Sequence, residues 1–251
     1  MEKITSRSNG LLVHMKKLAA SAAYRREQGV YLCDSPKLLA EALKWHAPVR
    51  EIAVTAGVPL PPLSETVRTV EIPEDVMASI SPMKSPQGTL FTVTLPDAEV
   101  PETLSGCRYL VLDGVQDPGN VGTILRTLDA FDFDGLLLLE GCADPWSVKT
   151  VRSSMGAVFR RPVWCLKAAQ LPDLLVRSGL PLYGTALRED TEDVRAIALD
   201  RCAVVIGSEG QGISDAVLAM CQKTIRIPMT DRCESLNAAI AAAVVLWESY
   251  R

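Results

Sequence analysis

Short apolar runs that end in polar or glycine-containing loops constrain the fold of this chain more than any other feature. Residues 109–112, 136–139 and 203–206 are apolar at nearly every position rather than at alternate ones. Strands of this kind are buried on both faces, as in a parallel sheet covered by helices. Helical periodicity follows most of these runs, so strand and helix alternate along the chain. The second half of the chain is therefore predicted to be an α/β domain with a parallel sheet.

The remaining elements extend this pattern to both halves. In the second half we expect helices from residue 121, at 148–154, at 168–177 and from 236 to the C-terminus, and further strands at 158–163, 182–187 and 225–228. In the first half we expect helices at 9–27, 36–45 and 74–80, and strands at 30–33, 51–55, 66–72 and 89–95. Residues 96–106 are acidic, proline-containing and weakly periodic, so we predict domains at 1–95 and 106–251 with a linker at 96–105.

Two loops at the carboxyl ends of predicted strands contain residues suited to ligand binding. Residues 207–212 read Gly-Ser-Glu-Gly-Gln-Gly, and glycines allow close backbone approach or positive φ. The spacing is not that of a dinucleotide or P-loop motif, and Glu209 would repel a phosphate. The other loop follows a strand that should stop at Pro228, and it leads to Ser235 and Asn237 at the start of a helix. Taken alone, that second loop is an ordinary helix N-cap; together the two loops predict a ligand crevice at this sheet edge.

A third loop, residues 113–120, follows the strand at 109–112 and is rich in turn-forming residues. The helix expected after it has an apolar stripe, with Asn120 at its start and Arg126 pointing away from the stripe. Considered alone, Asn120 would be a cap and Arg126 a residue on a solvated face.

Composition excludes several classes of protein. The chain has 251 residues, a net charge of −4 and no long uncharged apolar stretch or signal-peptide pattern. Its seven cysteines contain no Cys-x-x-Cys pair, which predicts reduced thiols in the cytoplasm and no metal site. Basic residues are concentrated in residues 1–50, and Lys16, Lys17, Arg25 and Arg26 are candidate phosphate contacts. A solvated helix face explains them equally well.

The three loops, in this order, resemble the signature motifs of the SpoU/TrmH family of RNA 2′-O-ribose methyltransferases, part of the SPOUT superfamily. The matching stretches are 113–126, 207–212 and 227–237, and residues 151–159 match a further family segment, so the resemblance covers about residues 106–251. Residues 4–9, 17–18, 25–26 and 85–88 resemble, less sharply, the family's substrate-binding domain, whose fold is like that of a ribosomal RNA-binding protein. The chain departs from that pattern at Asp34-Ser35-Pro36, where relatives usually have a glycine, and this puts local RNA contacts there in doubt.

The resemblance implies a homodimer that binds S-adenosylmethionine in the loops of a deep trefoil knot. The matching cofactor-binding residues are Gly207, Gly210, Ile227, Met229, Leu236 and Asn237. The matching catalytic residues are Arg126, Asn120, Glu209, Ser235 and Asn237; the amides and the serine would orient the hydroxyl, and Glu209 either holds a ribose or orders its loop. RNA, most simply ribosomal RNA, would be the partner, with Arg152 as a further RNA contact beside the basic N-terminal residues.

Arg126 has two possible roles under this resemblance. It either clamps a phosphate and fixes the ribose, for which the guanidinium fork is well shaped, or acts as the general base proposed for the family. The very high pKa of an arginine side chain favours the first role.

Two other functions share much of this sequence pattern. A catalytically silent protein of ribosomal RNA binding or assembly would not need Asn120, Arg126, Glu209, Ser235 and Asn237 together. A transfer-RNA methyltransferase would share all the chemistry. The separate N-terminal domain favours ribosomal RNA only by analogy.

Overall fold

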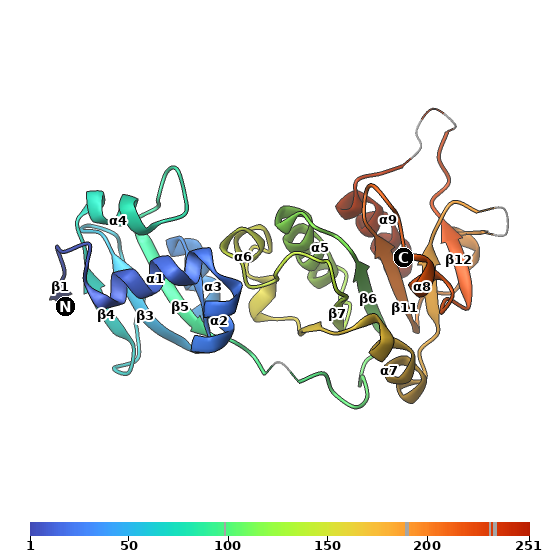
Figure 1. The fold of residues 1–251 in the computed structure, drawn as a ribbon, viewed down its shortest axis with the longest axis horizontal. Helices are drawn as coiled ribbons and strands as arrows, with labels where there is room; N and C mark the ends of the chain where they lie inside the picture. The colour runs from blue at the N-terminus through green and yellow to red at the C-terminus, as the bar shows by residue number, and fades with distance from the viewer. Residues whose placement is uncertain (98, 189–190, 231, 233–234) are drawn as a thin grey trace. The chain divides into compact units, whose positions relative to one another are not determined.

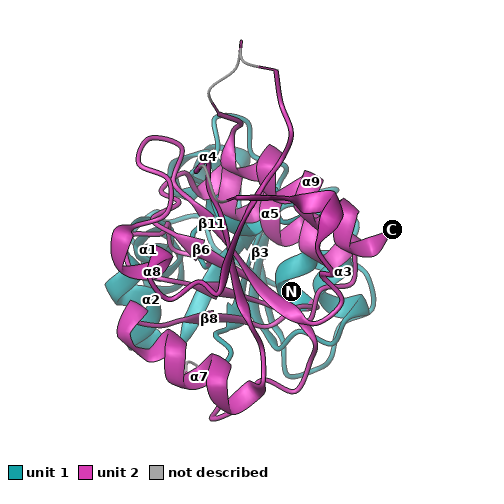
Figure 2. Ribbon diagram, turned by 90° about the vertical axis from the view of Figure 1, so that its right-hand side faces the viewer, with its two compact units in different colours: residues 1–97, 146–159 teal, residues 98–145, 160–251 magenta. Residues whose placement is uncertain are grey.

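The computed structural model describes residues 1–97, 99–188, 191–230, 232 and 235–251. The chain forms two compact units, coloured separately in Figure 2: unit 1 comprises residues 1–97 and 146–159, and unit 2 comprises 98–145 and 160–251. A segment from the second half of the sequence is thus grouped with the N-terminal residues. The domain limits expected from the sequence remain a prediction.

Figure 1 labels most of the elements along the chain. Unit 1 contains strands β1 (Glu2–Lys3), β2 (Val30–Asp34), β3 (Val49–Val54), β4 (Arg68–Glu71) and β5 (Thr89–Thr94), helices α1 (Gly10–Ala20), α2 (Ala22–Gln28), α3 (Pro36–Lys44), α4 (Glu74–Ile80) and α6 (Val148–Ser153), and the 3-10 helix η1 (Ala157–Phe159). Unit 2 contains strands β6 (Arg108–Asp113), β7 (Gly135–Leu138), β8 (Val163–Cys165), β9 (Leu182–Thr185), β10 (Glu192–Asp193), β11 (Cys202–Gly207) and β12 (Lys223–Arg226), helices α5 (Pro118–Ala130), α7 (Leu171–Ser178), α8 (Asp215–Leu218) and α9 (Ala238–Tyr250), and the 3-10 helices η2 (Ala168–Gln170) and η3 (Val194–Ala196).

The sheet of unit 2 is parallel, as the continuous apolar runs predict. Its strand order is β10-β12-β9-β11-β6-β7-β8, and every pairing between these strands is parallel. Strand β11 lies between β9 and β6, although β10 separates it from β9 in the sequence and β6 lies far upstream. The carboxyl ends of β6, β7, β9, β11 and β12 therefore meet at one edge of the sheet, where ligands bind in open α/β folds.

Helices cover both faces of this sheet. Tyr109, Val111, Leu137 and Val205 belong to one buried cluster with side chains of α7 and α8. On the opposite face α5 and α9 pack against each other, and they contact β7 and β11 respectively (Figure 2). Successive strand residues point to opposite faces, so runs such as 109–112 must be apolar throughout.

Unit 1 has a mixed five-stranded sheet in the order β1-β4-β3-β5-β2. Strand β5 is antiparallel to both β2 and β3, whereas β4 is parallel to β1 and β3. Its core joins α1 and α4 to one sheet face, and Val148 of α6 belongs to the same cluster. This matches the small α/β sandwich expected from the alternation of elements.

Two expected elements of the chain differ in the structure. The single helix expected at 9–27 is two helices, because Ser21 is extended (φ −129°) and its side chain accepts a hydrogen bond from the Tyr24 N–H at 3.1 Å. The basic strand expected at 158–163 is wrong as well: η1 occupies its start, and β8 begins only at Val163. Arg160 and Arg161 instead form ion pairs with Asp129 of α5, at 2.7 and 2.8 Å.

Helix α5 begins earlier than expected, at Pro118 rather than Val121. Asp117 is its N-cap, with Oδ1 accepting from the N–H groups of Gly119 (2.5 Å) and Asn120 (3.2 Å). Proline suits the first helical position because its missing N–H would have no partner there. Since Asp117 caps the helix, the side chain of Asn120 is left available for other contacts.

Candidate active site

Three residues from distant segments, namely the first turn of α5, the loop after β11 and the N-cap of α9, form a hydrogen-bonded cluster in unit 2. The Asn120 side-chain amide donates to Oε1 of Glu209. Nδ2 of Asn237 lies 3.4 Å from the same oxygen and 3.3 Å from Oδ1 of Asn120. Oδ1 of Asn237 also accepts from the N–H groups of Ala239 and Ile240, so the residue caps α9 as well. The two amides fix the direction of the Glu209 carboxylate.

The glycine loop after β11 is closed by its own backbone. The Ser208 N–H donates to the Gly212 carbonyl at 3.0 Å, and the Gly212 N–H donates back at 2.9 Å. A Cβ on Gly207 would overlap the backbone of Gly212 and Ile213, so this position needs glycine because the loop folds back on it. Gly212 has φ +70°, whereas a Cβ on Gly210 would meet no atom within 4 Å. The three glycines of the loop therefore have different structural roles.

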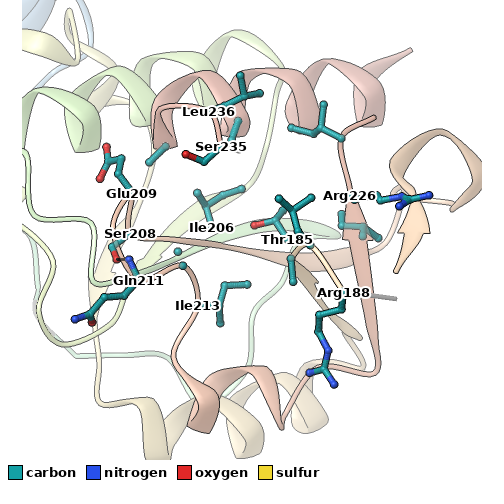
Figure 3. Close-up of a pocket in the computed structure, with 18 of the residues that line it drawn as sticks. Thr185, Arg188, Ile206, Ser208, Glu209, Gln211, Ile213, Arg226, Ser235 and Leu236 are labelled. Atoms are coloured by element: carbon teal, nitrogen blue, oxygen red, sulfur yellow. Dashed lines mark hydrogen bonds between the residues drawn. The ribbon is translucent and has the colours of Figure 1, made fainter. Parts of the chain in front are cut away.

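An apolar cavity of about 360 Å³ lies beside this loop, at the carboxyl ends of β9, β11 and β12. Ile206, Ile213 and Leu236 form part of its wall (Figure 3), and Ile225 lines it as well. Figure 3 shows Glu209 on one side of the cavity and Arg188 and Arg226 on the other. Small-molecule sites commonly combine such an apolar wall with a few polar groups.

Most of the residues expected to bind the cofactor line this cavity. Gly207, Ile227, Met229 and Leu236 do so, as do Ser235 and Glu209 from the expected catalytic set. Gly210 and Asn237 lie outside its wall. Residues 185–188, at the end of β9 and directly after it, line the same cavity but were not predicted as site residues. The end of the strand expected at 182–187 was the available signal, since carboxyl ends of parallel strands share one edge.

The chemistry of this wall suits S-adenosylmethionine. Its apolar side chains can enclose an adenosyl group, and Glu209 is the one carboxylate among the described residues that line it, a favourable partner for a positive centre. Residues 185–188, 207, 226–227 and 229 line the cavity as well. The apolar wall and the Glu209 carboxylate therefore fit a largely apolar ligand that carries a positive charge.

A family model of the SpoU rRNA methylase family matches residues 108–247, and a model of the MRM3-like substrate binding domain matches residues 13–90. The chain belongs to the SpoU rRNA methylase family. It is 31% identical to the 23S rRNA (guanosine(2553)-2′-O)-methyltransferase RlmP of Bacillus subtilis, over 98% of both chains.

Two solved structures cover nearly the whole of this SpoU-family chain. A TrmH-family protein from Porphyromonas gingivalis is 34% identical, with a TM-score of 0.83 over 96% of this chain and 97% of that one. The SpoU methyltransferase AviRb from Streptomyces viridochromogenes, in complex with AdoMet, is 26% identical, with a TM-score of 0.84 over 97% of each chain. The expected SPOUT fold, enzyme class and cofactor are confirmed: this is an S-adenosylmethionine-dependent RNA 2′-O-ribose methyltransferase. The knot remains a prediction.

Arg126, the expected catalytic arginine of this SpoU-family protein, is not part of the cluster formed by Asn120, Glu209 and Asn237. It lies on the exposed side of α5. Within the described part of the chain it makes no hydrogen bond or ion pair. Its guanidinium is therefore available for a ligand from outside the subunit core.

The N-terminal basic residues divide into two groups. Lys16, Lys17 and Arg26 are exposed, as a phosphate-binding role requires. Arg25 corrects the prediction: it is only 4% exposed, and Nη1 donates to the carbonyl of Leu18 at 2.5 Å. The Arg25 guanidinium therefore links α2 to the backbone of α1, and we no longer count Arg25 among the candidate phosphate contacts.

Arg152, the other expected RNA contact, pairs with a buried carboxylate. Nη1 lies 2.7 Å from Oδ2 of Asp34, within unit 1. Burial raises the pKa of Asp34 above its ordinary value, and the Arg152 guanidinium acts in the opposite direction. The RNA-binding role of Arg152 stays a prediction, and any such contact would have to share the guanidinium with Asp34.

The described part of the chain contains neither a candidate membrane-spanning helix nor a candidate metal site. No helix in that part of the chain is both long and apolar enough to cross a bilayer. Among the same residues, no three His, Cys, Asp or Glu side chains are grouped as a metal would need.

Proposed function

We propose that this protein methylates the ribose 2′-hydroxyl of a guanosine in the large ribosomal RNA. The target class follows from the name of the Bacillus subtilis relative and from the match to a substrate-binding domain in residues 13–90. One observation supports the proposal most: Glu209 lines the apolar cavity and is held there by the amides of Asn120 and Asn237. A fixed hydrogen-bond acceptor thus borders the site whose chemistry suits the cofactor.

The residues of the site would carry out two tasks. S-adenosylmethionine, when bound, supplies an electrophilic methyl group on a sulfonium. A ribose hydroxyl is a weak nucleophile, so it needs an acceptor for its hydrogen bond and a fixed orientation. Glu209 would accept that bond, and the two amides would keep the carboxylate aligned. The apolar wall would exclude water, which strengthens these interactions.

Arg126 would position the RNA rather than remove a proton. An arginine guanidinium stays protonated in proteins and offers a planar fork of donors for phosphate oxygens. Its exposure on α5 leaves it accessible to an RNA phosphate. The apolar residues Ile240, Trp247 and Tyr250 of α9, the helix that packs against α5, are each more than half exposed. A second copy of the chain would cover this α9 face, which gives the proposed homodimer.

The proposal also places the protein in the cytoplasm with ribosomal RNA. None of the cysteines that the structure describes forms a disulfide, which is compatible with a reducing compartment. The state in solution can be read directly: light scattering of the wild-type chain should give a dimer, and Trp247→Glu should shift it to monomer. A wild-type monomer at micromolar concentration would contradict the dimer.

Single-turnover methylation tests the chemistry. With ribosomal RNA and labelled cofactor, Glu209→Gln and Arg126→Ala should each slow methyl transfer by about two orders of magnitude or more. Arg126→Lys should keep part of the rate, because the charge remains while the fork is lost. Calorimetry should show that both Arg126 variants bind S-adenosylmethionine as the wild type does. A catalytically silent RNA-binding protein would give no transfer with any variant, and wild-type rates for Arg126→Ala would remove that residue from the site.

A further inference from the structure

A second cavity, of about 460 Å³, adjoins the glycine loop in unit 2. Its wall comes from the carboxyl ends of β6, β7 and β11: Asp113, Gly114, Gln116, Glu140, Gly141 and Ser214, together with residues 208–212. Ser208, Glu209, Gln211 and Gly212 line both this polar cavity and the apolar cofactor cavity. One loop thus forms a wall of each cavity, and Glu209 is accessible from both.

The polar cavity is acidic and its carboxylates are held in place. Asp113 accepts the Ser214 N–H at 2.7 Å, and Glu140 accepts the Ala168 N–H at 3.2 Å. Glu209 accepts from the two asparagine amides of the catalytic cluster. Each carboxylate retains further acceptor sites beyond these bonds. No Lys or Arg is present among the described residues that line the cavity, so it does not suit a phosphate.

We propose that the polar cavity receives the base of the target nucleotide and selects guanine. This inference rests on the proposed function, because a base held here would keep its ribose beside Glu209, at the border of the cofactor cavity. Figure 3 shows the side chains of Glu209 and Gln211 directed away from Ile206 and Thr185, towards the outer side of the loop. Glu209 and Gln211 therefore lie at the border between the two cavities, both of which they line.

Guanine matches the donors and acceptors of this wall. Its Watson–Crick edge presents two adjacent donors, N1–H and the 2-amino group, beside the O6 acceptor. A carboxylate fork can accept the two donors in parallel, as it does from an arginine. The amides of Gln116 and Gln211 can donate to O6. Adenine and cytosine present an acceptor next to their amino group, and uracil presents a single donor between two carbonyls, so an acceptor-rich wall discriminates against all three.

Two substitutions separate this cavity from the cofactor cavity. Gly210 lines the polar cavity and not the cofactor cavity, and a Cβ there meets nothing within 4 Å. A side chain can therefore leave the backbone at this position, and Gly210→Trp should fill the cavity. Glu140→Gln keeps the side-chain volume but replaces one acceptor oxygen with a donor. Val176→Trp, on a residue of α7 that is 77% exposed and lines neither cavity, is the control for added bulk.

The first readout is the methylated nucleoside and the rate at which it forms. Digestion and mass spectrometry of wild-type-treated ribosomal RNA should yield 2′-O-methylguanosine; another 2′-O-methylnucleoside would overturn guanine selection. Gly210→Trp should lower kcat/KM for RNA by about tenfold or more while the Kd for S-adenosylmethionine stays within about twofold. Val176→Trp should leave both values unchanged. A wild-type kcat/KM for Gly210→Trp would overturn the assignment of the cavity.

The second readout tests the acceptor directly. In an RNA whose target guanosine is replaced by inosine, the 2-amino donor is absent, and the wild type should lose about 10- to 100-fold in kcat/KM, the effect of one charged hydrogen bond. Glu140→Gln should methylate the two RNAs at similar rates, which a merely structural role of Glu140 would not produce. Equal discrimination by wild type and Glu140→Gln would overturn the role of Glu140.

A third measurement tests the base site separately from the proposed function. Saturation-transfer NMR on the cofactor-saturated protein should show contact with guanosine, a weaker signal with uridine, and loss of the guanosine signal in Gly210→Trp. Contact with guanosine but no methyl transfer to ribosomal RNA would refute the proposed function and support the cavity. Methyl transfer to ribosomal RNA without any effect of Gly210→Trp on guanosine contact would support the proposed function and refute the assignment of the cavity.

Discussion

Replacing Gly207 with alanine should disrupt cofactor binding through the geometry of the loop. The new Cβ would overlap the backbone of Gly212 and Ile213, which cannot move aside as the end of a flexible side chain can. Relief requires the 208–212 turn to open, with the loss of the two backbone hydrogen bonds between Ser208 and Gly212.

The size of the effect follows from these contacts. Two neutral hydrogen bonds contribute about 0.5–1.5 kcal/mol each, and overpacking of a close-packed site costs about 1–3 kcal/mol. The total, about 2–6 kcal/mol, corresponds to a loss of cofactor affinity of about 30-fold or more if the altered loop must be restored on binding. Residues 207–209 and 211–212 all line the cofactor cavity, so the displacement reaches the ligand directly.

Calorimetric titration with S-adenosylmethionine and thermal unfolding measure this loss together. Gly210→Ala is a matched control in the same loop, since its Cβ meets nothing within 4 Å and the residue does not have positive φ. It should bind the cofactor within about twofold of the wild type. A folded Gly207→Ala protein with wild-type cofactor affinity would refute the reasoning, because the loop would then not need its observed geometry to hold the ligand.

Three further predictions concern other parts of the chain. Ser35 adopts φ 85° and ψ 144°, a conformation that favours glycine. Ser35→Gly should therefore stabilise unit 1 by about 1–2 kcal/mol, after the small loss of the N-cap hydrogen bond that the Ser35 side chain accepts from the Leu38 N–H. Chemical denaturation measures the free energy of unfolding, and a variant less stable than the wild type would contradict the prediction. Changing the exposed Lys16, Lys17 and Arg26 to Ala should lower the slope of log K against log salt for RNA binding by about 2–3 and leave cofactor affinity intact. The same change at the ion-paired Arg195, Lys223 and Arg251 is the control and should have little effect on the slope. Equal slopes for the first variant and the wild type would show that the three residues form only a solvated face. Burial raises the pKa of Cys142 and Cys221 to about 11 and that of Cys202 to about 12, so these thiols stay protonated at pH 8. They should alkylate far more slowly than the exposed Cys107 and Cys165, and their alkylation rates should rise as the pH approaches those pKa values. Peptide mapping of the alkylated native protein measures this, and equal labelling of Cys202 and Cys107 would contradict it.

The sequence by itself determined the type and approximate position of most elements. Runs such as 109–112 and 203–206 are apolar on both faces, and this local property predicted the parallel sheet correctly. Loop chemistry at the strand ends located Glu209, Leu236 and Asn237 near the site. Local prediction failed at Ser21, where a cap hydrogen bond from the Tyr24 N–H divides one expected helix. It failed also at Arg160 and Arg161, which form ion pairs with the distant Asp129 rather than a strand.

Only the tertiary structure decided which of these loops meet. Asn120 and Asn237 are 117 residues apart, and they share Glu209 because β11 lies between β6 and β9. It also buried Arg25, grouped residues 146–159 with unit 1, and showed that Gly207 is required by its own loop. The physical reason is one of range: periodicity and caps are set by residues a few positions apart, whereas strand order and burial depend on contacts between distant segments, which no local pattern encodes.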